Sequence, residues 1–289
     1  MNAKLKKSKT RTNNVASKFR LSPIISLCVI LLFCGCSSKL EHKAMHLRSN
    51  SPEVSGGLLT GKVDVQFINS ATRIYATLDE DLDGNQNDSD KQRIQNQSSS
   101  RLRADLGLHK IIDIYYRTGW ATPNIFGIKL QLAGEPRNIA EFGWKSSISA
   151  EYGIYNVTDN SNGLKEYSNN LYDISISIGK RFNSRVLLYY NFFYSRHKLD
   201  GNLSRDGNTK YSIDGVSSGF GGLIGLDYTF LNNEKFLGLT VNTHLAVEVG
   251  AIYLNWIDTR NHVNNITYQD ETLRDSAEGI TLSTGISWY

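Results

Sequence analysis

Beyond residue 36 the sequence contains no cysteine, since the three cysteines of this 289-residue chain are Cys28, Cys34 and Cys36. Disulfides, which stabilise many small exported domains, therefore cannot hold the rest of the chain together. The same region has no apolar run approaching the roughly 20 residues that a membrane-spanning helix requires. Proline is also scarce, with four in the whole chain. These absences favour a fold stabilised by extensive backbone pairing.

An excess of positive charge is also missing from the body of the protein. The formal net charge is +4, but residues 1–20 carry seven lysines and arginines and no acid. Without those seven, 25 basic residues face 28 acidic ones, which is a net charge of −3. Binding to nucleic acid normally requires a basic surface, so we expect no nucleic-acid partner.

Signs of catalysis are few. The HExxH zinc motif does not occur, and no adjacent Ser/His pair or Asp/His loop set stands out. His244 and Glu248 share one face of a predicted strand, but four residues of extended chain separate them by about 13 Å. That distance is too long for a direct acid–base pair. We therefore expect no enzymatic role, and we expect His244 to be a packed interior histidine.

The clearest pattern in the sequence is a hairpin at 172–194. From 172 to 181, Tyr172 and three isoleucines occupy alternate positions, and small or charged residues occupy the others. After Asn183 and Ser184, apolar and aromatic residues again occupy every second position from 186 to 194. Side chains alternate between the two faces of a strand, so this pattern predicts two strands joined by a tight turn, each with one apolar face.

Similar alternation recurs along the chain and predicts about ten strands. The others are expected at 61–78, 101–108, 111–118, 125–133, 140–155, 217–230, 236–256 and 279–289. Long polar connections (79–99, 119–124, 156–170, 197–210, 257–276) alternate with short ones (109–110, 134–138, 182–185, 231–235). Apolar residues on one face, polar residues on the other, and alternating short and long connections are typical of a transmembrane β-barrel. We predict an all-β, antiparallel up-and-down barrel whose long loops face outward.

The polar face of these strands is expected to point into the barrel lumen. It carries a nearly balanced set of charges: Lys62, Asp64, Arg101, Arg103, Asp105, Asp113, Arg117, Lys129, Glu141, Lys145, Glu151, Asp173, Arg181, Asp227 and Glu248. Because eight-stranded barrels are filled by their side chains, a ten-stranded barrel leaves little extra space. Opposite charges there should pair and fill the lumen. The alternative is a narrow pore.

The first residues have the features of an export signal. A basic segment precedes the apolar run at 21–33, and Gly35-Cys36 follows. The string Phe33-Cys34-Gly35-Cys36 resembles a bacterial lipobox, in which the cysteine after a small residue is acylated. We expect a lipoprotein signal peptide at 1–35, lipidation at Cys36, a polar tether at 36–58 and the barrel at 59–289. The alternatives are an ordinary signal peptide and an uncleaved anchor.

The signal, the lipobox and the strands together resemble a small outer-membrane β-barrel lipoprotein of a Gram-negative bacterium. Tyr289 is similar to the C-terminal aromatic residue of such barrels, although it is out of phase with the apolar residues before it. The resemblance implies an outer-membrane location with lipid and lipopolysaccharide as neighbours. We expect a structural or surface-interaction role carried by the outer loops. A narrow passive channel is the alternative, and an outer-membrane hydrolase is a third.

One outer loop carries a metal-binding pattern. Residues 79–90 fit D-x-D-x-D-G followed by an acid at the twelfth position, as in EF-hand-like calcium loops. The candidate oxygen ligands are Asp79, Asp81, Asp83, Asn85, Asn87 and Asp90. Asp90 replaces the usual glutamate, and the flanks are predicted strands instead of helices. The alternative is a solvated acidic loop.

Overall fold

The hairpin predicted at 172–194 is present as β7 (Lys165–Arg181) and β8 (Val186–Arg205), in a computed structural model of the chain. The Asn183 side chain closes the turn, because its oxygen accepts hydrogen bonds from the backbone N–H groups of Arg185 and Val186, both at 2.8 Å. The structure describes residues 40–42, 51–75, 93–119, 124–139, 141–159, 165–205, 208–262 and 271–289.

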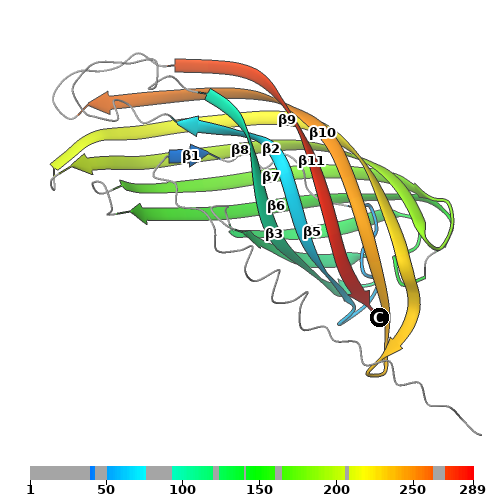
Figure 1. Cartoon of the computed structure of the whole chain (residues 1–289). Coiled ribbons are helices and arrows are strands. Elements are labelled where there is room, and N and C mark those ends of the chain that lie inside the picture. Colours follow the sequence, from blue (N-terminus) through cyan, green and yellow to red (C-terminus); the bar gives the residue numbers. More distant parts are fainter. Residues whose placement is uncertain are drawn as a thin grey trace, which may run out of the picture. The chain divides into compact units, whose positions relative to one another are not determined.

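Within these ranges ten strands close into an antiparallel barrel (Figure 1). Besides β7 and β8 they are β2 (Gly61–Tyr75), β3 (Arg93–His109), β4 (Ile112–Gly119), β5 (Asn124–Ala133), β6 (Gly143–Asp159), β9 (Asn208–Phe236), β10 (Leu239–His262) and β11 (Glu271–Trp288). Each strand pairs with the next in the sequence, and pairing of β11 with β2 completes the cylinder. The predicted all-β up-and-down barrel is confirmed. Among the described residues, no helix is long and apolar enough to cross a membrane.

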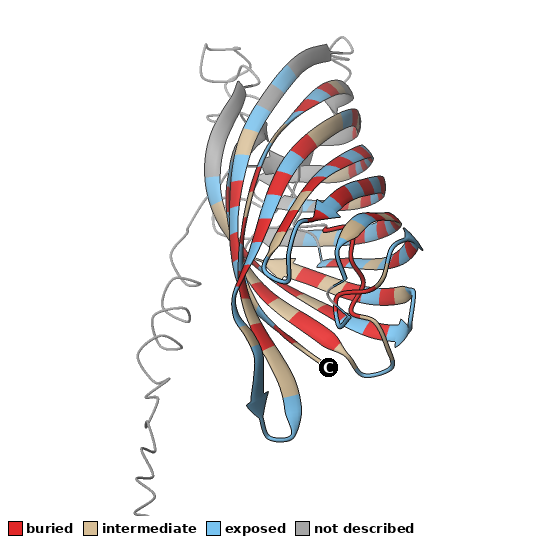
Figure 2. Ribbon diagram, turned by 90° about the vertical axis from the view of Figure 1, so that its right-hand side faces the viewer, coloured by how far each residue is buried: buried red, intermediate tan, exposed pale blue. Residues whose placement is uncertain are grey.

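Strand alternation separates the two faces of the barrel wall, as the red and pale blue bands of Figure 2 show. Along β7, Ile174, Ile176 and Ile178 are exposed, whereas Asp173, Ser175 and Ser177 are buried. The exterior is therefore apolar and the interior polar, which is the reverse of a water-soluble domain. This is the arrangement of a barrel that has lipid outside and polar groups inside.

The barrel has two ends that differ in their connections. We call the end with the connections 110–111, 134–142, 182–185 and 237–238 the turn end, and the opposite end the loop end. A short strand, β1 (Leu40–His42), pairs with β2 near the loop end, where Leu40 lies opposite Tyr75. Residues 51–60, in contrast, approach the turn end, because the Trp288 indole N–H donates to the Leu59 carbonyl oxygen at 2.9 Å.

The strands at the loop end are longer than predicted. Three of the predicted long loops, at 156–170, 197–210 and 257–276, are largely strand, because β8 runs to Arg205 and β9 begins at Asn208. The turn predicted at 231–235 is also strand, with the reversal displaced to Leu237 and Gly238. These predictions were wrong because a strand that extends past the lipid has water on both faces. It then loses the apolar alternation but keeps its backbone pairing.

Candidate functional site

The candidate site is the barrel interior, where charged side chains are concentrated. Of the fifteen charges assigned to the lumen, the structure buries fourteen. The exception is Glu141, which is exposed and precedes the first residue of β6, Gly143. The predicted strand at 140–155 was extended too far at this end, where a turn residue can face solvent without breaking any strand alternation.

Several of these buried charges form ion pairs along the wall. Arg103 holds Asp105 through two parallel hydrogen bonds of 2.8 and 2.7 Å, and Arg117 pairs with Glu151. Such charge-assisted bonds are the stronger class of hydrogen bond, and they compensate the cost of removing both charges from water. The wall therefore neutralises much of its own charge.

His244 contacts a further ion pair of the wall, between Lys62 and Asp64. Asp64 lies 2.7 Å from the Lys62 ammonium and 2.8 Å from the His244 Nε2 atom. Both Asp64 and His244 are fully buried. Glu248 points into the same lumen, but its carboxylate accepts a hydrogen bond from the Tyr189 hydroxyl at 2.7 Å and is not joined to His244. The structure therefore uses His244 as a packed side chain of the wall that contacts Asp64.

Two buried tyrosines fill the lumen in the same way. Tyr115 and Tyr189 each lie over a glycine of the neighbouring strand, Gly127 and Gly225, at positions where any side chain would collide with the ring. The Tyr115 hydroxyl donates to Glu151 at 2.7 Å, as Tyr189 does to Glu248. Each glycine thus provides the space that lets an aromatic ring lie flat against the wall and reach a buried acid.

We expect Gly225→Ala to destabilise the folded barrel by about 1–3 kcal/mol, the usual cost of overpacking a filled interior. The added methyl group would displace the Tyr189 ring and weaken its bond to Glu248. Gly222→Ala is the matched control on the same strand, because its nearest neighbour would lie at an ordinary 3.5 Å from the new methyl group. Urea unfolding in lipid vesicles measures both variants. Equal stability would contradict this packing.

A segment of the predicted tether also lies in this interior. Ser51, Glu53, Val54 and Ser55 are all buried. The Glu53 carboxylate accepts two hydrogen bonds from Arg181, at 2.6 and 2.5 Å. The side-chain nitrogens of Arg137 and Lys145 each lie 4.0 Å from the same carboxylate. One acid from the N-terminal segment is thereby surrounded by three cations of the barrel.

The backbone of this segment is fixed to the barrel wall as well. The Ser55 N–H donates to Asp113 at 2.7 Å, and its hydroxyl donates to the same oxygen at 3.0 Å. Lys129 donates to the Glu53 carbonyl oxygen at 3.2 Å. We call residues 51–57 the plug segment. Its bonds reach β4, β5 and β7, so it is held across the turn end of the lumen.

The turn between β5 and β6 closes over the plug segment. The Arg137 N–H donates to the Val54 carbonyl oxygen at 2.9 Å, and its guanidinium reaches across the barrel to Asp227 at 2.5 Å. Burial disfavours the charged form of Arg137, but the Asp227 carboxylate outweighs this and raises the pKa of the guanidinium above its ordinary value. Arg137 therefore stays charged and links the turn, the plug segment and β9.

Glu53 and Arg137 were not among the predicted site residues. Both lie in irregular segments, which carry no alternation that could assign them to a face of the wall. One of two acids within 36–58 and a lone arginine within the turn at 134–138 look like ordinary surface charges. The wall charges are nearly balanced, so they do not indicate that a further carboxylate is needed there.

The metal-binding and lipidation predictions concern other parts of the chain. The ligands proposed at 79–90 and Cys36 lie outside the described residues, so both remain predictions. Within the described ranges no cluster of three or more histidine, cysteine or acidic side chains is arranged to hold a metal ion.

One sequence string resembles the nucleophile motif of serine hydrolases. Residues 215–219 read Gly-Val-Ser-Ser-Gly and so fit GxSxG. In hydrolases that use this motif, the serine sits on a sharp turn between a strand and a helix. Here Ser217 is a buried residue in the middle of β9, paired with His197 of β8. The local geometry is that of a regular strand.

Comparisons with known proteins concern the fold alone. No protein-family model matches the sequence, and no curated protein sequence matches it. The outer membrane protease OmpT from Escherichia coli is 11% identical with a TM-score of 0.41, over 79% of this chain and 95% of that one. The outer membrane protein OprG from Pseudomonas aeruginosa is 10% identical with a TM-score of 0.34, over 82% and 98%. Ail, the attachment invasion locus protein of Yersinia pestis, is 10% identical with a TM-score of 0.27, over 80% and 98%.

Proposed function

We propose that this chain is a lipidated outer-membrane barrel of a Gram-negative bacterium whose lumen is closed by its own plug segment. It acts through the strand ends and loops at its outer end, in a structural or surface-interaction role and without catalysis. The observation that carries this proposal is the set of bonds to Glu53. A carboxylate held by Arg181, with Arg137 and Lys145 beside it, fixes the plug segment inside the barrel.

The exterior of the barrel supports insertion into a membrane. Near the loop end, Tyr116, Phe126, Tyr152 and Tyr172 are direct cross-strand neighbours on the outer face. Tyr194, Phe220 and Tyr253 continue this row around the barrel. Amphipathic aromatic rings favour the boundary between lipid and water. We call these seven residues the aromatic belt, and we propose that it marks the outer surface of the bilayer.

A second boundary lies near the turn end. Trp144 and Phe182 are exposed there, and the Lys180 ammonium lies 5.8 and 5.5 Å from their ring centres. Along β7, eight residues separate Tyr172 from Lys180, a path of roughly 26 Å along the strand. Residues 172–180 are nine in number, and about 9–11 residues of a tilted strand cross the hydrocarbon layer of a membrane. Short turns typically face the periplasm, so the loop end faces outward.

Conductance in a planar lipid bilayer tests the closed lumen. We expect the full-length protein to insert without producing current steps, because the plug segment and the wall charges fill its turn end. The double variant Glu53→Ala with Ser55→Ala removes one side-chain anchor to Arg181 and one to Asp113. We expect it to show brief openings.

Sustained conductance of the unmodified protein would overturn the closed lumen and favour the narrow passive channel. Turnover of phospholipid or peptide by the purified protein would instead favour the outer-membrane hydrolase. The proposal also includes lipopolysaccharide as a neighbour, calcium bound at 79–90 and acylation of Cys36.

A further inference from the structure

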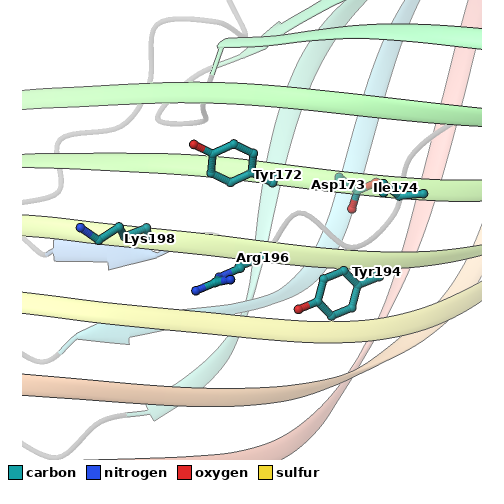
Figure 3. A pocket seen from close by; sticks show the side chains of 6 residues that line it. All are labelled: Tyr172, Asp173, Ile174, Tyr194, Arg196 and Lys198. Atoms are coloured by element: carbon teal, nitrogen blue, oxygen red, sulfur yellow. The ribbon is translucent and has the colours of Figure 1, made fainter.

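A hollow on the outer wall combines two tyrosines with two cations (Figure 3). It has a volume of about 440 Å³ and lies between β7 and β8. Its lining is Tyr172, Asp173, Ile174, Tyr194, Arg196 and Lys198. Asp173 is buried and points to the lumen side of the wall, whereas the other five belong to the outward row of their strands. The hollow therefore presents cations and aromatic rings to the lipid side.

The two cations of the hollow lie at the level of the aromatic belt and just beyond it, toward the loop end. Arg196 lies directly opposite Tyr172, a member of the aromatic belt, and Lys198 is one outward position further toward the loop end. Two residues of a strand span about 6.6 Å. If the belt marks the bilayer surface, both cations lie at the level of the lipid headgroups, while Ile174 lies at the level of the acyl chains.

The charges around the hollow favour an anion. On the outer face the cross-strand neighbours of Arg196 are Tyr172 and Ser218, and neither carries a charge. Lys198 lies 3.3 Å from Asp200, but both side chains are about half exposed. An exposed ion pair of this kind contributes little, so Lys198 can exchange Asp200 for a stronger acceptor.

We propose that this hollow binds the phosphate group of an outer-leaflet lipid. The Arg196 guanidinium matches phosphate by two parallel hydrogen bonds, and Lys198 adds a point charge. The tyrosine hydroxyls can donate to the phosphate or to neighbouring headgroup oxygens, and Ile174 contacts the acyl chains below. This proposal rests on membrane insertion, as proposed above, and is independent of whether the lumen is closed.

Native mass spectrometry of the full-length protein in detergent tests this site. The probes are dioleoyl phosphatidic acid, which carries a phosphate monoester, and dioleoylglycerol, which has the same chains without phosphate. We expect the protein to retain phosphatidic acid and to lose dioleoylglycerol. The double variant Arg196→Ala with Lys198→Ala should retain at least tenfold less phosphatidic acid. Lys180→Ala, which removes an outward cation at the turn end, is the matched control and should retain as much as the unmodified protein.

A third arm separates lipid from free phosphate. Ten-millimolar inorganic phosphate should leave lipid retention unchanged if the acyl chains contribute to binding, and its displacement of the lipid would assign the site to the free anion. The proposal would be overturned if the double variant retained as much phosphatidic acid as the unmodified protein does. It would also be overturned if the unmodified protein retained dioleoylglycerol as well as it retains phosphatidic acid. If the double variant does not fold, Asp200→Asn serves in its place, because freeing Lys198 should increase retention at least twofold. No increase would then count against the site.

Discussion

Replacing Glu53 with alanine is expected to lower the free energy of unfolding of the barrel by about 3–5 kcal/mol, the cost of breaking a buried ion pair by removing one partner. Glu53 is 3% exposed and Arg181 is 2% exposed, so water cannot replace the lost carboxylate. Arg137 retains Asp227, but Arg181 loses both of its hydrogen bonds to Glu53. The effect should therefore be dominated by an unpaired Arg181.

Urea unfolding of the protein in lipid vesicles, followed by tryptophan fluorescence, measures this change. Glu141→Ala is the matched control, since Glu141 is an exposed acid near the same end of the barrel. Surface substitutions of that kind usually change stability by less than about 0.5 kcal/mol. Similar results for the two variants would show that the plug segment contributes no more to stability than a surface residue does.

Replacing Ile176 with arginine is expected to reduce the stability of the inserted barrel by about 2–4 kcal/mol, the cost of an arginine on the lipid face near mid-depth. Ile176 is 44% exposed on the outer face, midway between Tyr172 and Lys180. Its cross-strand neighbours are Ile148 and Phe192, which provide no polar partner. The guanidinium would therefore have to reach past apolar side chains to find water.

Asn170→Arg is the matched control for depth. Asn170 lies in the same outward row of β7, but beyond the aromatic belt, where the cost of arginine falls to about 0–1 kcal/mol. Heat-modifiable migration on gels and urea unfolding in vesicles report the folded fraction of each variant. If both arginines are tolerated equally, the outer face between the two aromatic boundaries is not in contact with lipid.

The wall of the barrel was predictable because alternation is a local property. Ile176 and Ser177 were assigned to opposite faces from their neighbours alone, and the structure exposes the first and buries the second. The same reasoning placed Arg103, Asp113 and Arg181 inside. It misplaced Glu141 and shortened the strands at the loop end, because the pattern disappears where lipid no longer contacts one face.

The interior contacts were not predictable in the same way. Glu53 and Arg181 are 128 residues apart, and Arg137 and Asp227 are 90 residues apart. No local pattern selects these partners, because each lumen cation faces several acids across the barrel. The choice depends on strand tilt and register, which set the height of every side chain inside the cylinder.

The sequence by itself determined that this chain forms an antiparallel barrel with an apolar exterior and a charged interior. Successive side chains of a strand point to opposite faces, so the order of apolar and polar residues was sufficient to assign each one to the exterior or the interior. Only the tertiary structure decided that residues 51–57 lie inside the lumen and that Glu53 joins Arg181. The physical reason is that an irregular segment has no regular alternation of side chains from which their direction could be predicted. Its place is decided by partners on the closed barrel, since Arg181 pairs with Glu53 and Asp113 accepts hydrogen bonds from Ser55.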